Sequence, residues 1–224
     1  MYKIPKIIHY CWFGKNPLSE LAIKCIETWK KYCPDYEIKR WDESNFDIES
    51  NEYVKEAWDS KKWAFVADCA RLNALFNFGG IYMDTDVELI KNLDGFLKHK
   101  AFFGFENDER ISTATIGSFK ENPYFKLLLH YYDNRKFIMP DKSFDVTTNV
   151  TTITKSLVEN YGLKCNNEYQ EFEDGLVIYP RDWFSPKDFE STKTSLTKNS
   201  VAIHHFNASW WTDEERLTFS LQQH

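Results

Sequence analysis

Two aspartates, Asp84 and Asp86, stand two positions apart directly after a short apolar run at residues 81–83. Carboxylates spaced i and i+2 at a strand end, where the backbone usually bends, can chelate a hard divalent cation and leave coordination positions for phosphate oxygens. An isolated Asp-x-Asp is more often a solvated turn or a structural feature. Here a Gly-Gly pair and an aromatic strand precede it, so the sequence favours a metal site that holds a nucleotide diphosphate.

The segment before these aspartates predicts a helix that can position them. Residues 65–78 repeat apolar side chains with helical spacing, and the Gly-Gly pair that follows supplies the left-handed conformations that end a helix. Asp68 and Arg71 share one face of this helix. Helix rise places Asp68 about 16 Å before the glycines, and strand rise places Asp84 about 13 Å after them. A strand that folds back along the helix therefore brings Asp68, Arg71 and the aspartate pair to one level.

A second chemical candidate lies near the end of the chain, where a predicted strand at residues 201–204 leads into His204 and His205. An imidazole can complete the coordination of manganese by carboxylates. A His pair at a strand end is otherwise structural or solvent-exposed. Because side chains alternate between the two faces of a strand, only one of the two histidines can point into the site.

Composition limits the class of protein. At 224 residues the chain is long enough for one domain with a substantial core. A net charge of −6 gives no basic surface, which argues against nucleic acid as a partner. Five scattered cysteines without a CxxC pair argue against a disulfide framework and a zinc site, and indicate a reduced, cytoplasmic setting. Neither a membrane span nor a signal peptide is predicted.

The order of the predicted elements indicates an α/β fold. A strand at 5–12, a helix from residue 18 to Pro34 and a strand at 37–41 form a β-α-β unit, whose ligand crevice lies at the carboxyl ends of the strands, beside Trp12. Further helices are predicted at 52–59, 122–131 and 153–161, and strands at 87–90, 101–105, 176–179 and 201–204. Between residues 106 and 121 no element is predicted. We expect a single domain with a mixed, mostly parallel sheet flanked by helices.

Three motifs carry a resemblance to a known family. They are Ile-His-Tyr-Cys-Trp-Phe-Gly at residues 8–14, Asp68-x-x-Arg71, and Gly-Gly-Ile-Tyr-Met-Asp-Thr-Asp at residues 79–86. Together they resemble the DxD sugar transferases that include bacterial capsular polysaccharide glycosyltransferases and yeast initiating mannosyltransferases, a group related to the glucosylating domain of large clostridial toxins. The resemblance runs in order from about residue 3 to 97 and returns weakly at the Thr-rich loop and at Ser209-Trp210.

The resemblance implies a Rossmann-like fold of the GT-A type, a UDP-sugar donor, a manganese or magnesium ion and retention of anomeric configuration. Residues 1–97 would then form the nucleotide-sugar-binding part with the DxD motif, and residues 98–224 the acceptor side and a C-terminal lid. The function expected from it is transfer of galactose, glucose or an N-acetylhexosamine to a glycan or a lipid-linked oligosaccharide, in capsule or surface polysaccharide synthesis. The place expected is the cytoplasm, with peripheral association at the inner face of the membrane.

The resemblance also assigns roles to particular residues. Asp68 and Arg71 would bind the donor sugar and ribose, and Asn149 would face the donor sugar, which makes these three the catalytic candidates. Asp84 and Asp86 would hold the metal and the diphosphate, with His205 standing where the toxins use an acidic ligand. The remaining nucleotide contacts would come from Cys11, Trp12, Tyr82, Thr85, Ser209 and Trp210, with Trp12 stacked on the base and Ser209 and Trp210 closing over the diphosphate.

Two rival functions remain open from the sequence. One is a module with a relict site that binds a nucleotide sugar or a glycan, and the other is a metal-dependent hydrolase of nucleotide sugars. The intact set of Asp68, Arg71, Asp84 and Asp86 counts against a relict site. A hydrolase would release nucleotide from the donor without stimulation by any acceptor, whereas a binding module would release none.

Overall fold

The computed structural model describes residues 3–189 and 191–207, and its centre is a seven-stranded sheet of order β2-β1-β3-β6-β5-β8-β7. The strands are β1 (Ile7–Cys11), β2 (Glu37–Trp41), β3 (Gly80–Met83), β5 (Ala101–Phe105), β6 (Ile111–Ser118), β7 (Gln170–Glu171) and β8 (Leu176–Tyr179). Strands β1, β2, β3, β5 and β8 run one way, and β6 and β7 run the other way. This confirms the predicted mixed, mostly parallel sheet.

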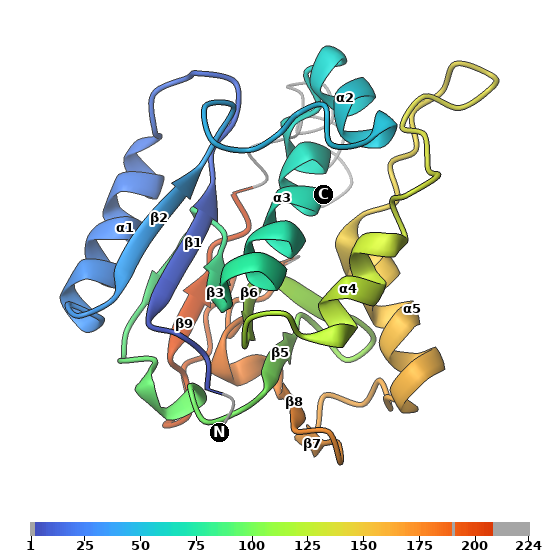
Figure 1. Cartoon of the computed structure of the whole chain (residues 1–224). Helices are drawn as coiled ribbons and strands as arrows, with labels where there is room; N and C mark the ends of the chain where they lie inside the picture. The colour runs from blue at the N-terminus through green and yellow to red at the C-terminus, as the bar shows by residue number, and fades with distance from the viewer. Residues whose placement is uncertain (1–2, 190, 208–224) are drawn as a thin grey trace.

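Helices cover both faces of the sheet (Figure 1). On one face α1 (Glu20–Tyr32) packs together with a separate two-stranded sheet of β4 (Val87–Leu89) and β9 (Ala202–His204). On the other face lie α2 (Glu52–Asp59), α3 (Trp63–Phe78), α4 (Pro123–His130) and α5 (Asn149–Tyr161). Two short 3-10 helices, η1 (Asp94–Phe96) and η2 (Arg181–Trp183), lie in the connections. None of the described helices is long and apolar enough to cross a bilayer.

The two cores follow from the alternation of side chains along the strands. In β1, Ile8 and Tyr10 join the core beneath α1, whereas Cys11 joins the core beneath α3. In β3, Ile81 belongs to the first core and Tyr82 to the second. Because both faces are covered, these strands are apolar on both sides, which is why they can be recognised in the sequence.

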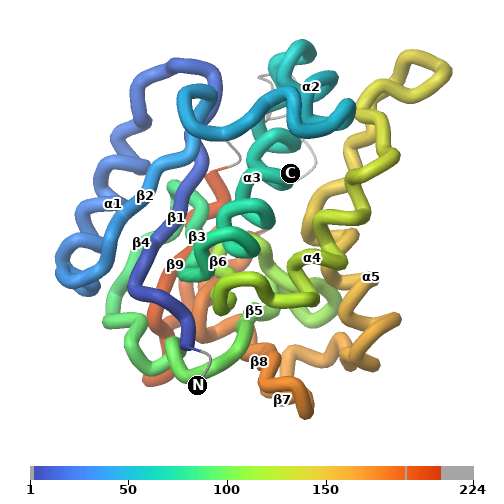
Figure 2. Tube along the Cα trace, in the orientation of Figure 1, coloured from blue at the N-terminus to red at the C-terminus, as the bar shows by residue number. Residues whose placement is uncertain are grey.

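Helix α1 shows how local sequence and packing agree. Ser19 caps its N-terminus by accepting a hydrogen bond from the N–H of Ala22 at 3.1 Å. At the buried face, the Trp29 indole donates to the carbonyl of Val87 at 2.7 Å and so ties α1 to β4. Figure 2 traces β4 beside β9, with which it pairs antiparallel.

The turn from α3 to β3 requires both of its glycines. Gly79 has a φ of 65° and Gly80 a φ of 107°, conformations that residues with a side chain rarely adopt. A Cβ atom at Gly79 would lie 2.6 Å from the main-chain nitrogen of Lys120, and one at Gly80 would lie 2.7 Å from the carbonyl oxygen of Ile7. This tight turn folds β3 back along α3, as the sequence predicted.

The structure differs from the predicted order most at β6, where no element was expected. Its sequence, Ile-Ser-Thr-Ala-Thr-Ile-Gly-Ser, contains few large apolar residues, yet all eight residues are buried. Small side chains suit a strand that is covered on both faces but give no strong hydrophobic signal. The short edge strand β7 was missed as well.

Candidate functional site

The two aspartates lie in the turn that joins β3 to β4. The main-chain N–H of Asp84 donates to the carbonyl of Ala114 in β6 at 2.9 Å, and the N–H of Val87 donates to the carbonyl of Asp84 at 3.0 Å. Oxygens of Asp84 and Asp86 and a ring nitrogen of His204 all lie within 4.8 Å of one another. Two carboxylates and one imidazole form a donor set that suits manganese or magnesium, so these residues fit the metal that the resemblance implies.

His204 replaces His205 in the candidate ligand set. Strand β9 places His204 opposite Val87, and the Nε2 atom of His204 lies 3.5 Å from Oδ1 of Asp86. The imidazole of His205 instead lies against Glu88, with Nε2 2.9 Å from Oε2. Because side chains alternate along a strand, only one histidine can face the aspartates. That histidine is His204, whereas the resemblance implied His205.

Asp86 and His204 perturb each other's ionisation. Burial opposes the charge on Asp86, but His204 and a hydrogen bond from the N–H of Asn207 at 2.7 Å outweigh it and hold the pKa of Asp86 below its ordinary value. Burial likewise opposes the charge on His204, but Asp86 raises the pKa of its imidazole. A metal ligand must be a neutral imidazole, so an ion bound here would compete with a proton for the His204 ring.

Arg71 connects the aspartate pair to Asp68, the convergence that the helix and strand distances predicted. Its guanidinium lies 3.1 Å from Asp68 Oδ1 and 3.5 Å from Asp84 Oδ1, and it donates to the carbonyl of Thr113 in β6 at 2.9 Å. The same group stands 4.6 Å from the centre of the Tyr82 ring, whose hydroxyl donates to Asp84 Oδ1 at 2.7 Å. Both carboxylates are therefore held by one buried cation.

Asn149 lies at the N-terminus of α5 and holds Asp68 from the other side. Its main-chain N–H donates to Asp68 Oδ2 at 3.1 Å, and its side-chain Nδ2 donates to the Asp68 carbonyl at 2.8 Å. Its Oδ1 accepts a hydrogen bond from the Tyr132 hydroxyl at 2.6 Å. Burial raises the pKa of Asp68 to about 6, although Arg71 opposes this. The structure thus shows Asn149 orienting Asp68, with both ends of its amide engaged.

The other predicted nucleotide contacts lie around this network. Trp12 is half-buried just beyond the carboxyl end of β1, and its indole donates to the Asn16 carbonyl at 2.7 Å. Thr85 is half-buried between the two aspartates. Cys11 is buried, and burial raises the pKa of its thiol to about 12, which keeps it an unreactive wall of the site. Ser209 and Trp210 lie outside the described residues.

Sequence reasoning missed Glu106, which directly follows β5. Burial raises the pKa of its carboxyl, and the charges of His204 and Asp84 also act on it, so this acid belongs to the surroundings of the aspartate pair. Its only signal in the sequence is an acidic residue at the end of a five-residue apolar strand. Arg110, whose carbonyl accepts a hydrogen bond from the Glu106 N–H at 2.8 Å, closes the loop that holds it.

Comparison with known proteins agrees with this geometry. Residues 19–103 match the family described as "Glycosyltransferase sugar-binding region containing DXD motif". "Inositol phosphoceramide mannosyltransferase 3" of Schizosaccharomyces pombe is 32% identical over 125 residues, which are 54% of this chain and 35% of that protein. "Mannosyl phosphorylinositol ceramide synthase CSH1" of Saccharomyces cerevisiae is 32% identical over 58% of this chain and 37% of that protein. The chain thus spans about a third of the length of these relatives.

Two further matches extend over more of the chain. "Uncharacterized glycosyltransferase L373" of Acanthamoeba polyphaga mimivirus is 27% identical over 96% of this chain and 86% of that protein. The solved structure of "PaToxG Glycosyltransferase" superimposes with a TM-score of 0.50 at 20% identity, over 72% of this chain and 70% of that one. The fold is therefore of the GT-A type, as predicted. The chain resembles the DXD-containing glycosyltransferases, the yeast mannosyltransferases among them.

Proposed function

We propose that this chain is a metal-dependent glycosyltransferase that uses a nucleotide-sugar donor. The observation that carries the proposal is the cluster of Asp84, Asp86 and His204, joined through Arg71 to Asp68. Residues 1–97 provide most of this cluster and are proposed as the donor side, and residues 98–207 as the acceptor side; the C-terminal lid expected at Ser209 and Trp210 lies outside the described residues. Asp84, Asp86 and His204 are the proposed metal ligands.

The donor is proposed to be a UDP-hexose carrying galactose, glucose or an N-acetylhexosamine. A relative at 32% identity is named as a mannosyltransferase, so a nucleotide-linked mannose joins the candidates. The acceptor is proposed to be a glycan or a lipid-linked oligosaccharide of capsule or surface polysaccharide synthesis. The inositol phosphoceramide in the name of that relative supports an acceptor with a lipid part. Peripheral association at the inner face of a membrane is proposed with it.

The proposed mechanism depends on positioning of the donor sugar and on stabilisation of the charge on the leaving diphosphate. A divalent ion, when bound, would stabilise the negative charge on the departing diphosphate as a Lewis acid. Asp68 and Arg71 hold the donor sugar, because they sit next to the aspartate pair and are fixed by buried partners. The acceptor hydroxyl attacks the anomeric carbon from the face that the diphosphate leaves, and the leaving phosphate takes its proton. This gives retention of configuration.

The test is nucleotide release from a panel of UDP-sugars and a nucleotide-linked mannose, with manganese present and with or without glycan acceptors. The variant Asp86→Asn removes one proposed ligand charge and should lower acceptor-dependent release on the order of 100-fold or more. Asp174→Asn, on an exposed residue beside β8, is the matched control and should behave as the unmodified protein.

Each alternative gives a different result in this assay. Release that no acceptor stimulates would identify a hydrolase. No release with any donor, together with retained nucleotide binding, would identify a binding module. Full acceptor-dependent turnover in Asp86→Asn with an unchanged need for metal would show that the ion is held elsewhere.

A further inference from the structure

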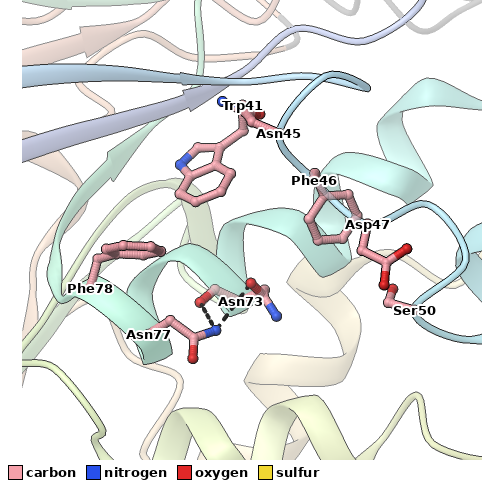
Figure 3. A pocket seen from close by; sticks show the side chains of 8 residues that line it. All are labelled: Trp41, Asn45, Phe46, Asp47, Ser50, Asn73, Asn77 and Phe78. Carbon is pink, nitrogen blue, oxygen red and sulfur yellow. Dashed lines mark hydrogen bonds between the residues drawn. The ribbon is translucent and has the colours of Figure 1, made fainter.

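A cavity lies on the side of α3 opposite to Arg71, away from the candidate site of transfer. Asn73 and Asn77 follow Arg71 by two and six positions, which turns them about 200° and 240° around the helix axis. With the end of β2 and the loop that follows it, they line an open, shallow cavity of about 480 Å³ (Figure 3). None of the residues proposed for sugar transfer lines it. Its walls include the side chains of Trp41, Phe46, Asp47, Asn73, Asn77 and Phe78.

Aromatic rings form the apolar part of this cavity. Trp41 and Phe78 lie side by side, with ring centres 5.4 Å apart. The Trp41 indole N–H is already donated to His9 at 3.0 Å and Trp41 is only 5% exposed, so Trp41 supports Phe78 from behind. Phe78 is 39% exposed although it follows a buried stretch of α3. The exposed part of the Phe78 ring can contact the C–H face of a pyranose.

Amides and a carboxylate form the polar part. Asn77 Nδ2 donates to the Asn73 carbonyl at 3.0 Å and to Asn73 Oδ1 at 3.1 Å, which fixes both amides. In the described part of the chain the structure gives no partner to Asn77 Oδ1 or Asn73 Nδ2, so one acceptor and one donor remain for a ligand. Asp47 accepts a hydrogen bond from the Glu49 N–H through Oδ1, leaving Oδ2 as a further acceptor. Such groups match neighbouring hydroxyls of a sugar.

The charge of the cavity argues for a neutral ligand. Asp47 is its single lining carboxylate, no lysine or arginine lines it, and the Nζ atom of Lys39 lies 3.8 Å from the centre of the Phe78 ring. The lining therefore lacks a cationic side chain that would attract phosphate groups. A nucleotide or a nucleotide sugar is therefore a poor match.

We propose that this cavity is a carbohydrate-binding site, separate from the site of transfer, that takes one pyranose ring of a neutral glycan. Its existence does not depend on the proposed transferase activity. If that activity holds, a glycan bound here by one residue would raise the local concentration of its other end near the transfer site.

The experiment is an NMR titration of the side-chain amides of the full chain with the methyl glycosides of glucose, galactose, mannose and N-acetylglucosamine. We expect at least one glycoside to shift the Asn73 and Asn77 amide signals at millimolar concentration. Asn77→Ala and Phe78→Ala should each weaken that binding at least tenfold. Both side chains are exposed, and a thermal unfolding curve would verify that the variants fold.

Two controls make the result specific. Asn160→Ala removes an amide on α5 that bonds the residue four positions earlier in the same way, at 2.8 Å, and should leave binding unchanged. Asp84→Asn should also leave it unchanged, because the transfer site is not involved. The proposal fails if no glycoside shifts the two amides, if Asn77→Ala and Asn160→Ala bind alike, or if binding is lost in Asp84→Asn.

Discussion

Tyr82 orients the first aspartate of the pair, and its hydroxyl can be removed with little change of shape. It donates to Asp84 Oδ1 at 2.7 Å from a fully buried ring. Groups that orient a metal ligand typically contribute 10-fold to 100-fold in affinity. We therefore predict that Tyr82→Phe lowers manganese affinity about 10-fold, measured by titration calorimetry or by the EPR signal of free manganese.

Tyr53→Phe is the matched control for this prediction. The Tyr53 hydroxyl is also buried, but it has no hydrogen-bond partner among the described residues. Its removal should leave manganese affinity unchanged and should not destabilise the fold. Equal affinity losses in the two variants would indicate a general effect of core tyrosines and would contradict the orienting role of Tyr82.

Part of the site could be predicted residue by residue, since helix and strand rises are fixed by backbone geometry. They brought Asp68, Arg71 and Asp84 together correctly. They could not choose between His204 and His205, because that choice depends on the register of β9 against β4, two strands more than a hundred residues apart. The bonds from Asn149 to Asp68 depend in the same way on where α5 docks.

At the scale of elements, His9 joins β1 to two of its neighbours. Its Nε2 donates to the Gly79 carbonyl at 2.7 Å, where α3 turns into β3, and its Nδ1 accepts from the Trp41 indole of β2 at 3.0 Å. The bond from Trp41 requires an unprotonated Nδ1, so the two bonds together need the neutral ring with its proton on Nε2. Burial lowers the pKa of His9 to about 4, and the nearby charge of Lys39 acts in the same direction.

This arrangement predicts a loss of stability in mild acid. Between about pH 6.5 and pH 4 the unfolded chain binds a proton at His9 that the folded chain does not, so the free energy of unfolding falls as the pH falls. The full effect is on the order of 3 kcal/mol. Urea unfolding would measure the free energy of unfolding of the unmodified protein and of His9→Gln, which has no titrating ring. The difference between the two free energies should change across this pH range.

The comparison of variants is needed because Asp68 acts in the opposite direction. Its raised pKa, about 6, adds stability as the pH falls, so the total curve mixes the two groups. Asp68 is present in both the unmodified protein and His9→Gln, so its contribution cancels when their free energies of unfolding are subtracted. His130→Gln, at an exposed ring, is the control. The prediction would be contradicted if the difference in free energy of unfolding between the unmodified protein and His9→Gln stayed constant between pH 7.5 and 4.5.

At the scale of the whole molecule, β6 joins the two halves of the sheet. It pairs antiparallel with β3 on one side and with β5 on the other, and the Thr113 carbonyl within it accepts a hydrogen bond from Arg71. The sequence predicted its two neighbours, β3 and β5, and missed this strand, because Ser, Thr, Ala and Gly lack the apolar pattern that marks a strand. Close packing across the sheet requires small side chains there, and the sequence alone does not show that packing.

Gly117 tests this explanation. A Cβ atom there would lie 2.0 Å from Cε1 and 2.5 Å from Cδ1 of Phe102 in β5. The Phe102 ring is fully buried and packs against Phe96 and Phe184, with ring centres 5.3 and 5.6 Å away, so it has no space into which to turn. Gly117→Ala should therefore lower the free energy of unfolding by about 1–3 kcal/mol, and the melting temperature by about 2–4 °C for each kcal/mol.

Gly95→Ala is the control, because a Cβ atom there would meet nothing within 4 Å. Its stability should stay within about 0.5 kcal/mol of the unmodified protein. Since β6 also anchors Arg71, Gly117→Ala should weaken donor binding as well, whereas a purely local defect would lower the melting temperature and leave donor affinity unchanged. Equal melting temperatures for the two alanine variants would mean that β6 and β5 can separate at no cost, and that close packing is not what makes this strand poor in large apolar residues.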